Sequence, residues 1–185
     1  MKARNPIILS AITLFGALYA GAMLAAPQKS DKQAKPDPKK PPFERVVKTE
    51  AEWKKTLTPN VFEITRKAGT EPAFRNEYWN NHKPGIYRCA DCGLDLFTSK
   101  TKFESGTGWP SFWQPLDNRY INKKSDHDLG YERTEVRCAR CDSHLGHVFD
   151  DGPKPTGLRF CMNSAALKFV PASKETKSTG AAPKP

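Results

Sequence analysis

Hydrophobic residues between positions 85 and 170 occur in short runs, and Gly, Pro, Asp and Asn separate these runs from one another. Short runs at this density are typical of strands in antiparallel sheets, whereas parallel sheets need a helix between successive strands. The pattern therefore predicts a mainly β domain built from antiparallel sheets. We expect its strands at residues 86–88, 94–97, 119–121, 135–137, 144–149 and 158–170, with a break in the last run.

Two short helices are expected ahead of this β region. Residues 49–52, TEAE, form a capping box before an apolar run, and Thr58 followed by Pro59 marks the start of a second helix. We expect Gly69 to end the second helix. A further short turn is expected at residues 76–79. The aromatic side chains of this region are expected to pack on the sheet, so the helices would form a small N-terminal cover.

The first 26 residues have the pattern of an export signal. Lys2 and Arg4 precede an uncharged run, residues 6–26, that is rich in Leu, Ile and Ala, and residues 20–22 offer a small-x-small cleavage site. The run is also long enough for one membrane-spanning anchor. We predict that residues 1–26 are a signal peptide or an N-terminal anchor. The protein would then be exported, either to the periplasm or to a membrane-anchored position facing away from the cytoplasm.

Two segments flank the predicted domain of residues 43–170. Residues 27–42 and 171–185 contain Lys and Pro but no large apolar residue, so we expect a disordered linker and a disordered tail. The formal net charge of the chain is +10, but residues 43–170 carry only +3. Because most of the basic excess lies outside the domain, we expect no nucleic-acid partner. Any membrane association is expected through the N-terminus, and the protein is expected to be a monomer.

Four of the five cysteines form two C-x-x-C pairs, at positions 89–92 and 138–141. Each pair follows a predicted strand and precedes a residue suited to a tight turn, Gly93 or Asp142. Two such turns facing each other would offer four thiolates in the tetrahedral geometry that zinc prefers in closed structural sites. We expect one structural Zn²⁺ per chain, holding the two halves of the sheet together. Its ligands would be Cys89, Cys92, Cys138 and Cys141.

Two alternatives remain open for these cysteine pairs. They could form disulfides, because an exported protein meets oxidants. Each pair could also be a thioredoxin-like redox pair, although neither one opens a helix in a βαβ unit.

The fifth cysteine, Cys161, lies in a run with alternating character. In a strand, the apolar residues at 158, 160 and 162 would point to one side, and Arg159, Cys161 and Asn163 would share the other. A cation and an amide beside a thiol favour the thiolate, which is the nucleophilic form of cysteine. The alternative, that Cys161 is a small buried hydrophobic residue, stays open from alternation alone.

Five motifs and the two C-x-x-C pairs occur in order along residues 44–170. The motifs are TEPAF at 70–74, GWPSF at 108–112, HLGHVF at 144–149, DGP at 151–153 and RFCMNS at 159–164. A chain with this series of motifs resembles the B-type methionine sulfoxide reductases, which reduce the R epimer of protein-bound methionine sulfoxide. The resemblance implies a β-tent-like fold and an oxidoreductase. Its partners would be oxidised proteins and a thioredoxin-like or small-thiol reductant.

The resemblance also implies roles for the residues at matching positions. Cys161 would attack the sulfoxide sulfur and become a sulfenic acid. His144 and His147 would supply the proton that the departing oxygen requires, because an imidazole titrates near neutral pH. A β-bulge at Gly146 could bring both histidines to one side of their strand. Asn163 would orient a histidine or a water molecule.

Three further positions carry implied roles in binding the substrate. Trp109 would form the apolar wall that receives the methyl group, and so would distinguish the R epimer from the S epimer. Asp151 and Arg159 would form a charge pair that positions the site, although such pairs are commonly structural.

One position departs from the pattern of many family members. They carry a second cysteine just before the GWPSF motif, where this chain has Thr107. With four cysteines assigned to zinc and one to catalysis, an internal disulfide would lack a partner. We therefore expect an external thiol to regenerate Cys161 directly.

Two other functions compete with this interpretation. One is an exported zinc-ribbon binding module without catalysis, against which the nearly balanced charge of the domain counts if the ligand is a nucleic acid. The other is a structural or adhesive exported domain, which would have no use for a free thiol.

Overall fold

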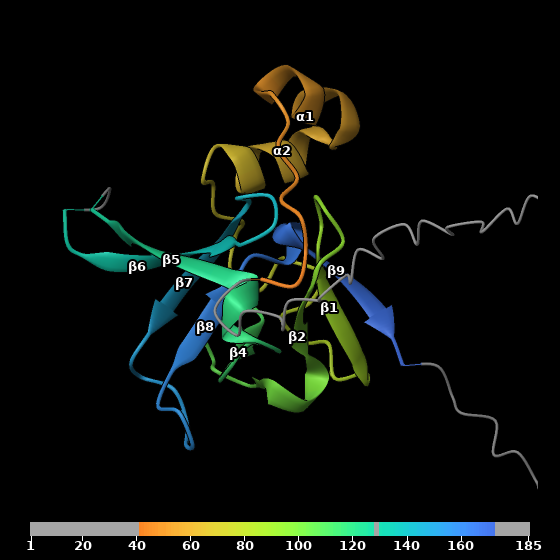
Figure 1. Ribbon diagram of the computed structural model, residues 1–185. Helices are drawn as coiled ribbons and strands as arrows, with labels where there is room; N and C mark the ends of the chain where they lie inside the picture. Colours follow the sequence, from red (N-terminus) through yellow and green to blue (C-terminus); the bar gives the residue numbers. More distant parts are fainter. Residues whose placement is uncertain (1–40, 128–129, 173–185) are drawn as a thin grey trace, which may run out of the picture. The chain divides into compact units, whose positions relative to one another are not determined.

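The computed structural model describes residues 41–127 and 130–172 (Figure 1). The predictions for residues 1–26, for nearly all of the linker and for nearly all of the tail concern residues outside these ranges. Within the described ranges, no helix combines the length and the apolar character that crossing a membrane requires.

The described strands form two antiparallel sheets (Figure 1). The smaller sheet has the strand order β2-β1-β9, and the larger sheet has the order β3-β4-β8-β7-β6-β5. This arrangement confirms the prediction of a mainly β domain built from antiparallel sheets. The strands are β1 Gly85–Cys89, β2 Asp95–Thr98, β3 Lys102–Phe103, β4 Ser111–Phe112, β5 Ile121–Asp126, β6 Arg133–Cys138, β7 His144–Phe149, β8 Arg159–Met162 and β9 Leu167–Pro171.

Two short helices, α1 (Glu50–Thr56) and α2 (Pro59–Arg66), lie next to each other at one end of the sheets (Figure 1). The expected capping box is present at α1: Glu52 donates its backbone N–H to Thr49, and its carboxylate accepts the N–H of Thr49 at 2.7 Å. The expected stop at Gly69 is wrong. The helix α2 already ends at Arg66, because the chain turns into the left-handed region at Ala68, where φ is 54°.

One of the strand predictions is wrong, and another gains detail. Residues 119–121 were expected as a strand, but Asn118–Tyr120 form a 3₁₀ helix, η2, and β5 begins only at Ile121. The run at 158–170 does break, as expected, but the break transfers the chain between sheets. A 3₁₀ helix, η3 (Ser164–Ala166), separates β8 in the larger sheet from β9 in the smaller one. The short strands β3 and β4 were not predicted.

An aromatic core joins the two sheets. Phe97 of the smaller sheet stacks on Phe112 of the larger sheet at 4.5 Å between ring centroids, and lies 5.9 Å from the ring of Phe160. Tyr87 meets Phe112 edge-on at 5.0 Å. All four rings are fully buried. Such pairs each contribute about 0.5–1.5 kcal/mol beyond burial of area. Because Phe160 points into this core, its neighbour Cys161 must face the opposite side of β8.

Candidate active site and metal cluster

The two C-x-x-C segments are built alike from their backbones upward. One follows β1 and the other follows β6, so each begins where a strand ends. The N–H of Gly93 donates to Cys89 at 2.9 Å, and the N–H of Asp142 donates to Cys138 at 2.9 Å. Gly93 and Asp142 both have positive φ, 75° and 60°, as their turn requires. The sequence prediction that these two residues close tight turns is confirmed.

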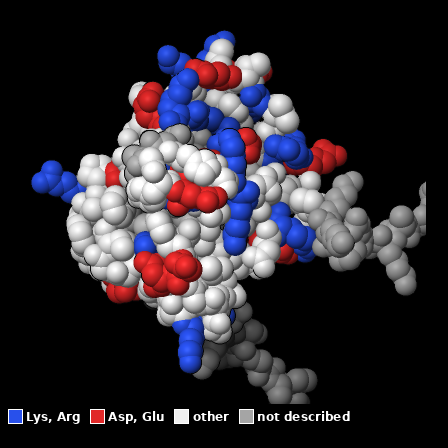
Figure 2. Space-filling view, turned by 90° about the vertical axis from the view of Figure 1, so that its left-hand side faces the viewer, with Lys and Arg blue, Asp and Glu red and all other residues white. Residues whose placement is uncertain are grey.

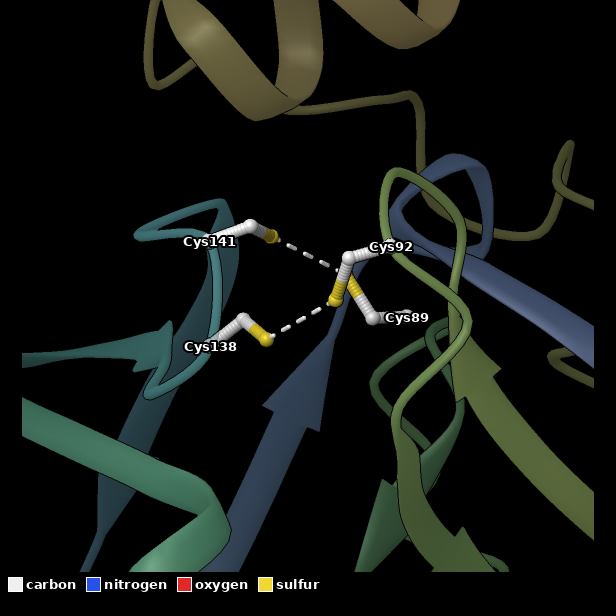
Figure 3. Close-up of side chains that lie close together, drawn as sticks. All are labelled: Cys89, Cys92, Cys138 and Cys141. Carbon is white, nitrogen blue, oxygen red and sulfur yellow. Dashed lines mark hydrogen bonds between the residues drawn. The ribbon is translucent and has the colours of Figure 1, made fainter. Parts of the chain in front are cut away.

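The four thiols of these turns gather in one cluster (Figure 3). The Sγ atoms of Cys89 and Cys141 lie 3.6 Å apart, as do those of Cys92 and Cys138, and all four lie within 4.8 Å of one another. A disulfide would bring two sulfurs to about 2.05 Å, and all five cysteines are free thiols. Four thiolates on one zinc ion, each at about 2.3 Å, would be separated by roughly 3.8 Å. The cluster therefore fits a metal ion better than disulfides.

The cluster connects two separate sheets rather than two halves of one sheet. Cys89 ends a strand of the smaller sheet, whereas Cys138 ends a strand of the larger sheet. A metal ion held here would consequently tie the sheets together at one end, beneath the helices (Figure 3).

Arg66, at the end of α2, contacts both cysteine turns. Its guanidinium bonds Asp91 in the first turn at 2.8 Å through Nε, and donates to the carbonyl oxygen of Cys141 in the second turn at 3.0 Å. It also lies 4.1 Å from the centre of the Trp53 ring. The Asp91 side chain is 0% exposed, so burial raises its pKa, although the Arg66 charge acts in the opposite direction. Arg66 thus links helix α2 to both of the turns that carry the cluster cysteines.

A single row of residues crosses the larger sheet through the reactive thiol. Cys161 on β8 lies directly opposite His147 on β7, and on its other side opposite Ser111 on β4. The row continues from His147 to Glu135 on β6 and then to Lys124 on β5. Directly opposed residues project to the same face with their Cβ atoms roughly 4.5–5.5 Å apart. The sheet register alone therefore sets the thiol beside an imidazole, and the imidazole beside a carboxylate.

Hydroxyl groups surround the thiol on the side away from His147. The Thr107 hydroxyl lies 3.8 Å from the Cys161 Sγ, and it is held by Ser105 at 2.8 Å. Ser105 in turn accepts a hydrogen bond from Ser111 at 2.7 Å. Burial raises the pKa of the Cys161 thiol, while the hydroxyl of Thr107 and the charge of Arg159 lower it in part. The thiol is accordingly sheltered from solvent but has donors ready for a thiolate.

The two histidines lie on one side of β7, as expected. The pairing of β6 with β7 shifts between Val136 and Arg137, which leaves Leu145 as an extra residue between His144 and Gly146. This bulge brings the rings of His144 and His147 to 5.5 Å between their centroids. Gly146 is required here, because an added Cβ would lie 2.1 Å from the carbonyl oxygen of Cys161.

Each histidine bonds a carboxylate. His144 Nδ1 lies 2.7 Å from Glu135, and His147 Nε2 lies 2.6 Å from Asp126. Burial lowers the pKa of His147, and its bond to Asp126 offsets part of that effect. Burial acts to raise the pKa of Glu135. Its hydrogen bond to His144 and the charge of Arg137 lower the pKa by more, so the net shift is downward. The sequence analysis did not identify Asp126 or Glu135.

Asn163 holds backbone groups rather than a histidine ring. Its Oδ1 accepts the N–H of Glu71 at 3.2 Å, and its Nδ2 donates to the carbonyl of Leu145, within the bulge, at 3.4 Å. Glu71 also accepts the indole N–H of Trp109 on its backbone oxygen at 3.0 Å. Its carboxylate bonds the N–H groups of Ser164 and Ala165, and burial raises its pKa. Glu71, which the sequence analysis did not single out, therefore joins Trp109 to Asn163.

A cavity of about 250 Å³ opens at the thiol. Its walls include Cys161, His147, Trp109 and Asn163, so the structure brings together four of the residues implied by the motifs. His144 does not line this cavity but borders a different one.

Asp151 and Arg159 form the expected charge pair, but neither lines this cavity. Two parallel bonds of 2.8 Å join the carboxylate to the guanidinium, whose carbon lies 4.3 Å from the centre of the Phe149 ring. The hydrogen bond to Asp151 raises the pKa of the Arg159 guanidinium, and the hydrogen bond to Arg159 lowers the pKa of Asp151. Of the two residues, Arg159 acts on Cys161, because its charge lowers the pKa of the thiol in part.

The surface around these elements carries both signs of charge. On the face in Figure 2, Lys and Arg side chains are interspersed with Asp and Glu side chains. This mixture agrees with the small net charge of the domain that the sequence shows.

Comparisons with known proteins place the chain in a family. The SelR domain model matches residues 57–171. Peptide methionine sulfoxide reductase MsrB of Thiobacillus denitrificans is 55% identical over 124 residues, which cover 67% of this chain and 94% of that protein. The MsrB of Synechococcus is 56% identical over 124 residues, covering 67% and 91%. The MsrB of Acinetobacter baylyi is 50% identical over 135 residues, covering 73% and 97%.

The chain therefore belongs to the SelR family, the B-type peptide methionine sulfoxide reductases, which confirms the resemblance carried by the motifs. It is an enzyme of the oxidoreductase class. Among solved structures, the Mis18 Yippee-like domain aligns with a TM-score of 0.39 and 15% identity over 50% of this chain and 100% of that chain. That likeness is too low to bear on function.

Proposed function

We propose that this protein reduces the R epimer of methionine sulfoxide in oxidised proteins, with Cys161 as the nucleophile. The observation that carries this proposal is the register of β7 against β8, which sets Cys161 directly opposite His147 inside a cavity walled by Trp109. The thiol, the proton donor and the apolar wall are the three parts that reduction of a sulfoxide requires. The family membership supports the same reaction.

The first step transfers oxygen from methionine to cysteine. The Cys161 sulfur attacks the sulfoxide sulfur while His147 gives a proton to the oxygen, because an unprotonated oxygen is a poor leaving group. The proton comes from the Cys161 thiol by way of His147. The S–O bond then breaks and the oxygen leaves as hydroxide. Hydroxide adds to the Cys161 sulfur as the new S–S bond breaks, and the methionine sulfur keeps the electron pair of that bond. The products are methionine and the sulfenic acid of Cys161, so the cysteine sulfur is oxidised by two electrons and the methionine sulfur is reduced by two.

Trp109 supports selection of the R epimer. Its indole is fixed by the bond to the Glu71 carbonyl, so the ring is a rigid wall of the cavity. If the methyl group packs on this wall, one epimer directs its oxygen to His147 and the other directs it away. Replacement of Trp109 by Ala should weaken substrate use more than it slows the chemical step.

Regeneration of Cys161 is proposed to use an external thiol. Thr107, not a cysteine, lies 3.8 Å from Cys161, and the other four cysteines belong to the cluster. One thiol would condense with the sulfenic acid, releasing water and forming a mixed disulfide. A second thiol would then free Cys161 and leave as a disulfide. The donor would be a thioredoxin-like protein or a small thiol.

The cluster is proposed to hold one structural zinc ion. Cys89, Cys92, Cys138 and Cys141 would fill all four positions of a tetrahedral site, which leaves no open position for substrate. Its contribution would be to join the two sheets, and the chemistry would remain with Cys161.

Export is proposed from the N-terminal sequence alone. The enzyme would then lie in the periplasm or be anchored to a membrane and face away from the cytoplasm. Its reductant would act on the same side of that membrane. The monomeric state and the signal or anchor at residues 1–26 belong to the same proposal. Sequencing of the mature N-terminus tests it: a start near Met23 supports cleavage, and an intact N-terminus in the membrane fraction supports an anchor.

The decisive experiment uses separated R and S epimers of a methionine sulfoxide peptide with dithiothreitol. We expect turnover of the R epimer by the wild type, none of the S epimer, and none of either by Cys161→Ser. Equal turnover of both epimers contradicts the proposal. In a second arm, one equivalent of R substrate without reductant is followed by dimedone. An adduct on Cys161 supports direct recycling, whereas a disulfide from Cys161 to a cluster cysteine refutes it.

A further inference from the structure

Two matched triplets of side chains lie behind the thiol. In one, His144 bonds Glu135, which accepts a bond from Arg137 at 3.0 Å. In the other, His147 bonds Asp126, which accepts a bond from Arg133 at 2.5 Å. Each imidazole is therefore joined to a carboxylate, and each carboxylate is joined to a guanidinium.

The arginines determine which partner donates in each triplet. A guanidinium keeps the adjacent carboxylate ionised, and an ionised carboxylate can only accept hydrogen bonds. His144 must then carry its hydrogen on Nδ1, which faces Glu135. His147 must carry its hydrogen on Nε2, which faces Asp126. The two neighbouring imidazoles are consequently held as opposite tautomers, and a proton that His147 gives to substrate leaves from Nδ1.

A second cavity reaches these groups from the other side. It has a volume of about 360 Å³ and shares Thr70, Arg133 and His147 with the cavity at Cys161. All but one of its lining residues, Ala68, are polar or charged. The charged and titratable groups facing it are Lys124, Asp126, His127, Arg133, Glu135, Arg137, His144 and His147.

His144 lines this second cavity, but its Nε2 does not open onto it. Its Nε2 is buried and has no hydrogen-bond partner among the described residues, and the side chain is 2% exposed. Buried polar atoms of this kind are ordinarily bonded, commonly to an ordered water molecule.

We propose that Asp126 and Glu135 are positioning residues that fix His147 and His144 as opposite tautomers, so that Nδ1 of His147 is free to take the proton of the Cys161 thiol and to pass it to the sulfoxide oxygen. The inference rests on the proposed function and deepens it by assigning the residues that hold the two histidines. Asp126 and Glu135 do not line the cavity at Cys161 and act only through their histidines. The proton that the thiol loses is the proton that the oxygen gains, so the step balances within the site.

The first test needs no variant. Imidazole nitrogens of ¹⁵N-histidine-labelled wild-type protein are observed by NMR at about pH 8, where a histidine of ordinary pKa is neutral. The signals are assigned with His82→Gln and His127→Gln. We expect His147 to be the Nε2–H tautomer and His144 the Nδ1–H tautomer, both in slow exchange. The same tautomer for both rings, or averaging between tautomers, overturns the inference even if the enzyme is fully active.

The second test compares Asp126→Asn with the wild type on the R-sulfoxide peptide. An amide in place of the carboxylate permits the wrong tautomer, so kcat should fall between about 10²-fold and 10⁴-fold with little change in KM. The limb of the pH profile that reports His147 should move to lower pH, because the imidazolium has lost its negative partner. Asp126→Glu, which keeps a carboxylate, should recover part of the activity and restore that limb.

Asp117→Asn is the matched control, since Asp117 also bonds an arginine, Arg119, but at η2 and away from both cavities. It should leave kcat and the pH profile unchanged. A pH profile of Asp126→Asn that overlays the wild type overturns the inference, as does a loss of kcat explained wholly by a smaller folded fraction. Failure of the proposed function gives a different result, namely a wild type no more active than Cys161→Ser.

Discussion

Five cysteines occupy two environments in this protein, and the contrast shows how neighbours determine what a thiol does. The four cluster thiols lie in turns at strand ends, where each sulfur has other sulfurs as its nearest partners. Cys161 lies inside a strand, between a hydroxyl chain and an imidazole, and no other cysteine of the described residues lines its cavity. The same functional group thus has other thiols as partners at one place and hydroxyl and imidazole groups as partners at the other.

Burial has a different consequence at each place. In the cluster, a metal ion would keep the thiolates ionised and unreactive in spite of burial. At Cys161, burial raises the pKa of the thiol, and burial also lowers the pKa of His147. Both shifts favour a neutral thiol beside a neutral imidazole in the resting enzyme. A neutral thiol is a poor target for oxidants, so Cys161 is protected from oxidation in this state.

The largest expected effect separates the cluster from the reactive thiol. Cys138→Ser removes one of four ligands, so the two sheets lose their shared anchor. We expect loss of bound zinc and a decrease in the free energy of unfolding by more than about 5 kcal/mol, comparable with the total stability of many domains. Metal analysis and a denaturation curve measure this. Soluble Cys138→Ser with wild-type stability would show that the cluster is not structural.

Cys161→Ser should have the complementary effect. Without the nucleophile, turnover of the R epimer should fall by at least about 10⁴-fold. The free energy of unfolding should change by less than about 1 kcal/mol, because oxygen replaces sulfur without removing a packing group. Zinc content should equal that of the wild type. A Cys161→Ser protein that loses its metal would mean that the two environments are coupled.

A smaller effect is expected at Arg66, which links helix α2 to both cysteine turns. Arg66→Met leaves the Asp91 carboxylate buried without its cation, which should destabilise the protein by about 3 kcal/mol. Zinc should also pass to a chelator faster, because both cysteine turns lose a bond. The control is Arg88→Met, which breaks an exposed pair with Asp95 and should change stability by less than about 1 kcal/mol. Equal stability and equal rates of zinc transfer in the two variants would show that Arg66 does not stabilise the cysteine turns.

The same contrast explains what could be predicted from the sequence. The cysteine turns are local, so the spacing and the residues Gly93 and Asp142 were sufficient to predict them. The bulge that unites His144 and His147 was likewise predictable from Gly146 between them. Their roles in catalysis were implied by the resemblance and remain predictions.

The rest of the site depends on pairing between distant segments. Asp126 reaches His147 only because β5, β6 and β7 are neighbours, and β5 has a polar sequence that no hydrophobic pattern reveals. Glu71 meets Asn163 across 92 positions of the chain. The early end of α2 was missed because Ala68 adopts a positive φ that glycine was expected to supply. Charged residues in buried places are visible only when the partners that stabilise them are known.

The smallest expected effect tests how far the hydroxyl at position 107 prepares the thiol. The bond from Thr107 lowers the pKa of Cys161 against the larger effect of burial. Thr107→Val removes the hydroxyl with little change of shape, so the pKa should rise and less thiolate should be present at a given pH. The profile of alkylation rate by iodoacetamide should move to higher pH, and the rate near neutral pH should fall by about twofold to fivefold, as expected for one weak hydrogen bond. Thr107→Ser keeps the hydroxyl and is the matched control, with a profile close to that of the wild type. If Thr107→Val reacts as fast as Thr107→Ser across the whole profile, the hydroxyl does not stabilise the thiolate. The Thr107 side chain, whose oxygen lies 3.8 Å from the Cys161 Sγ, would then only pack beside Cys161.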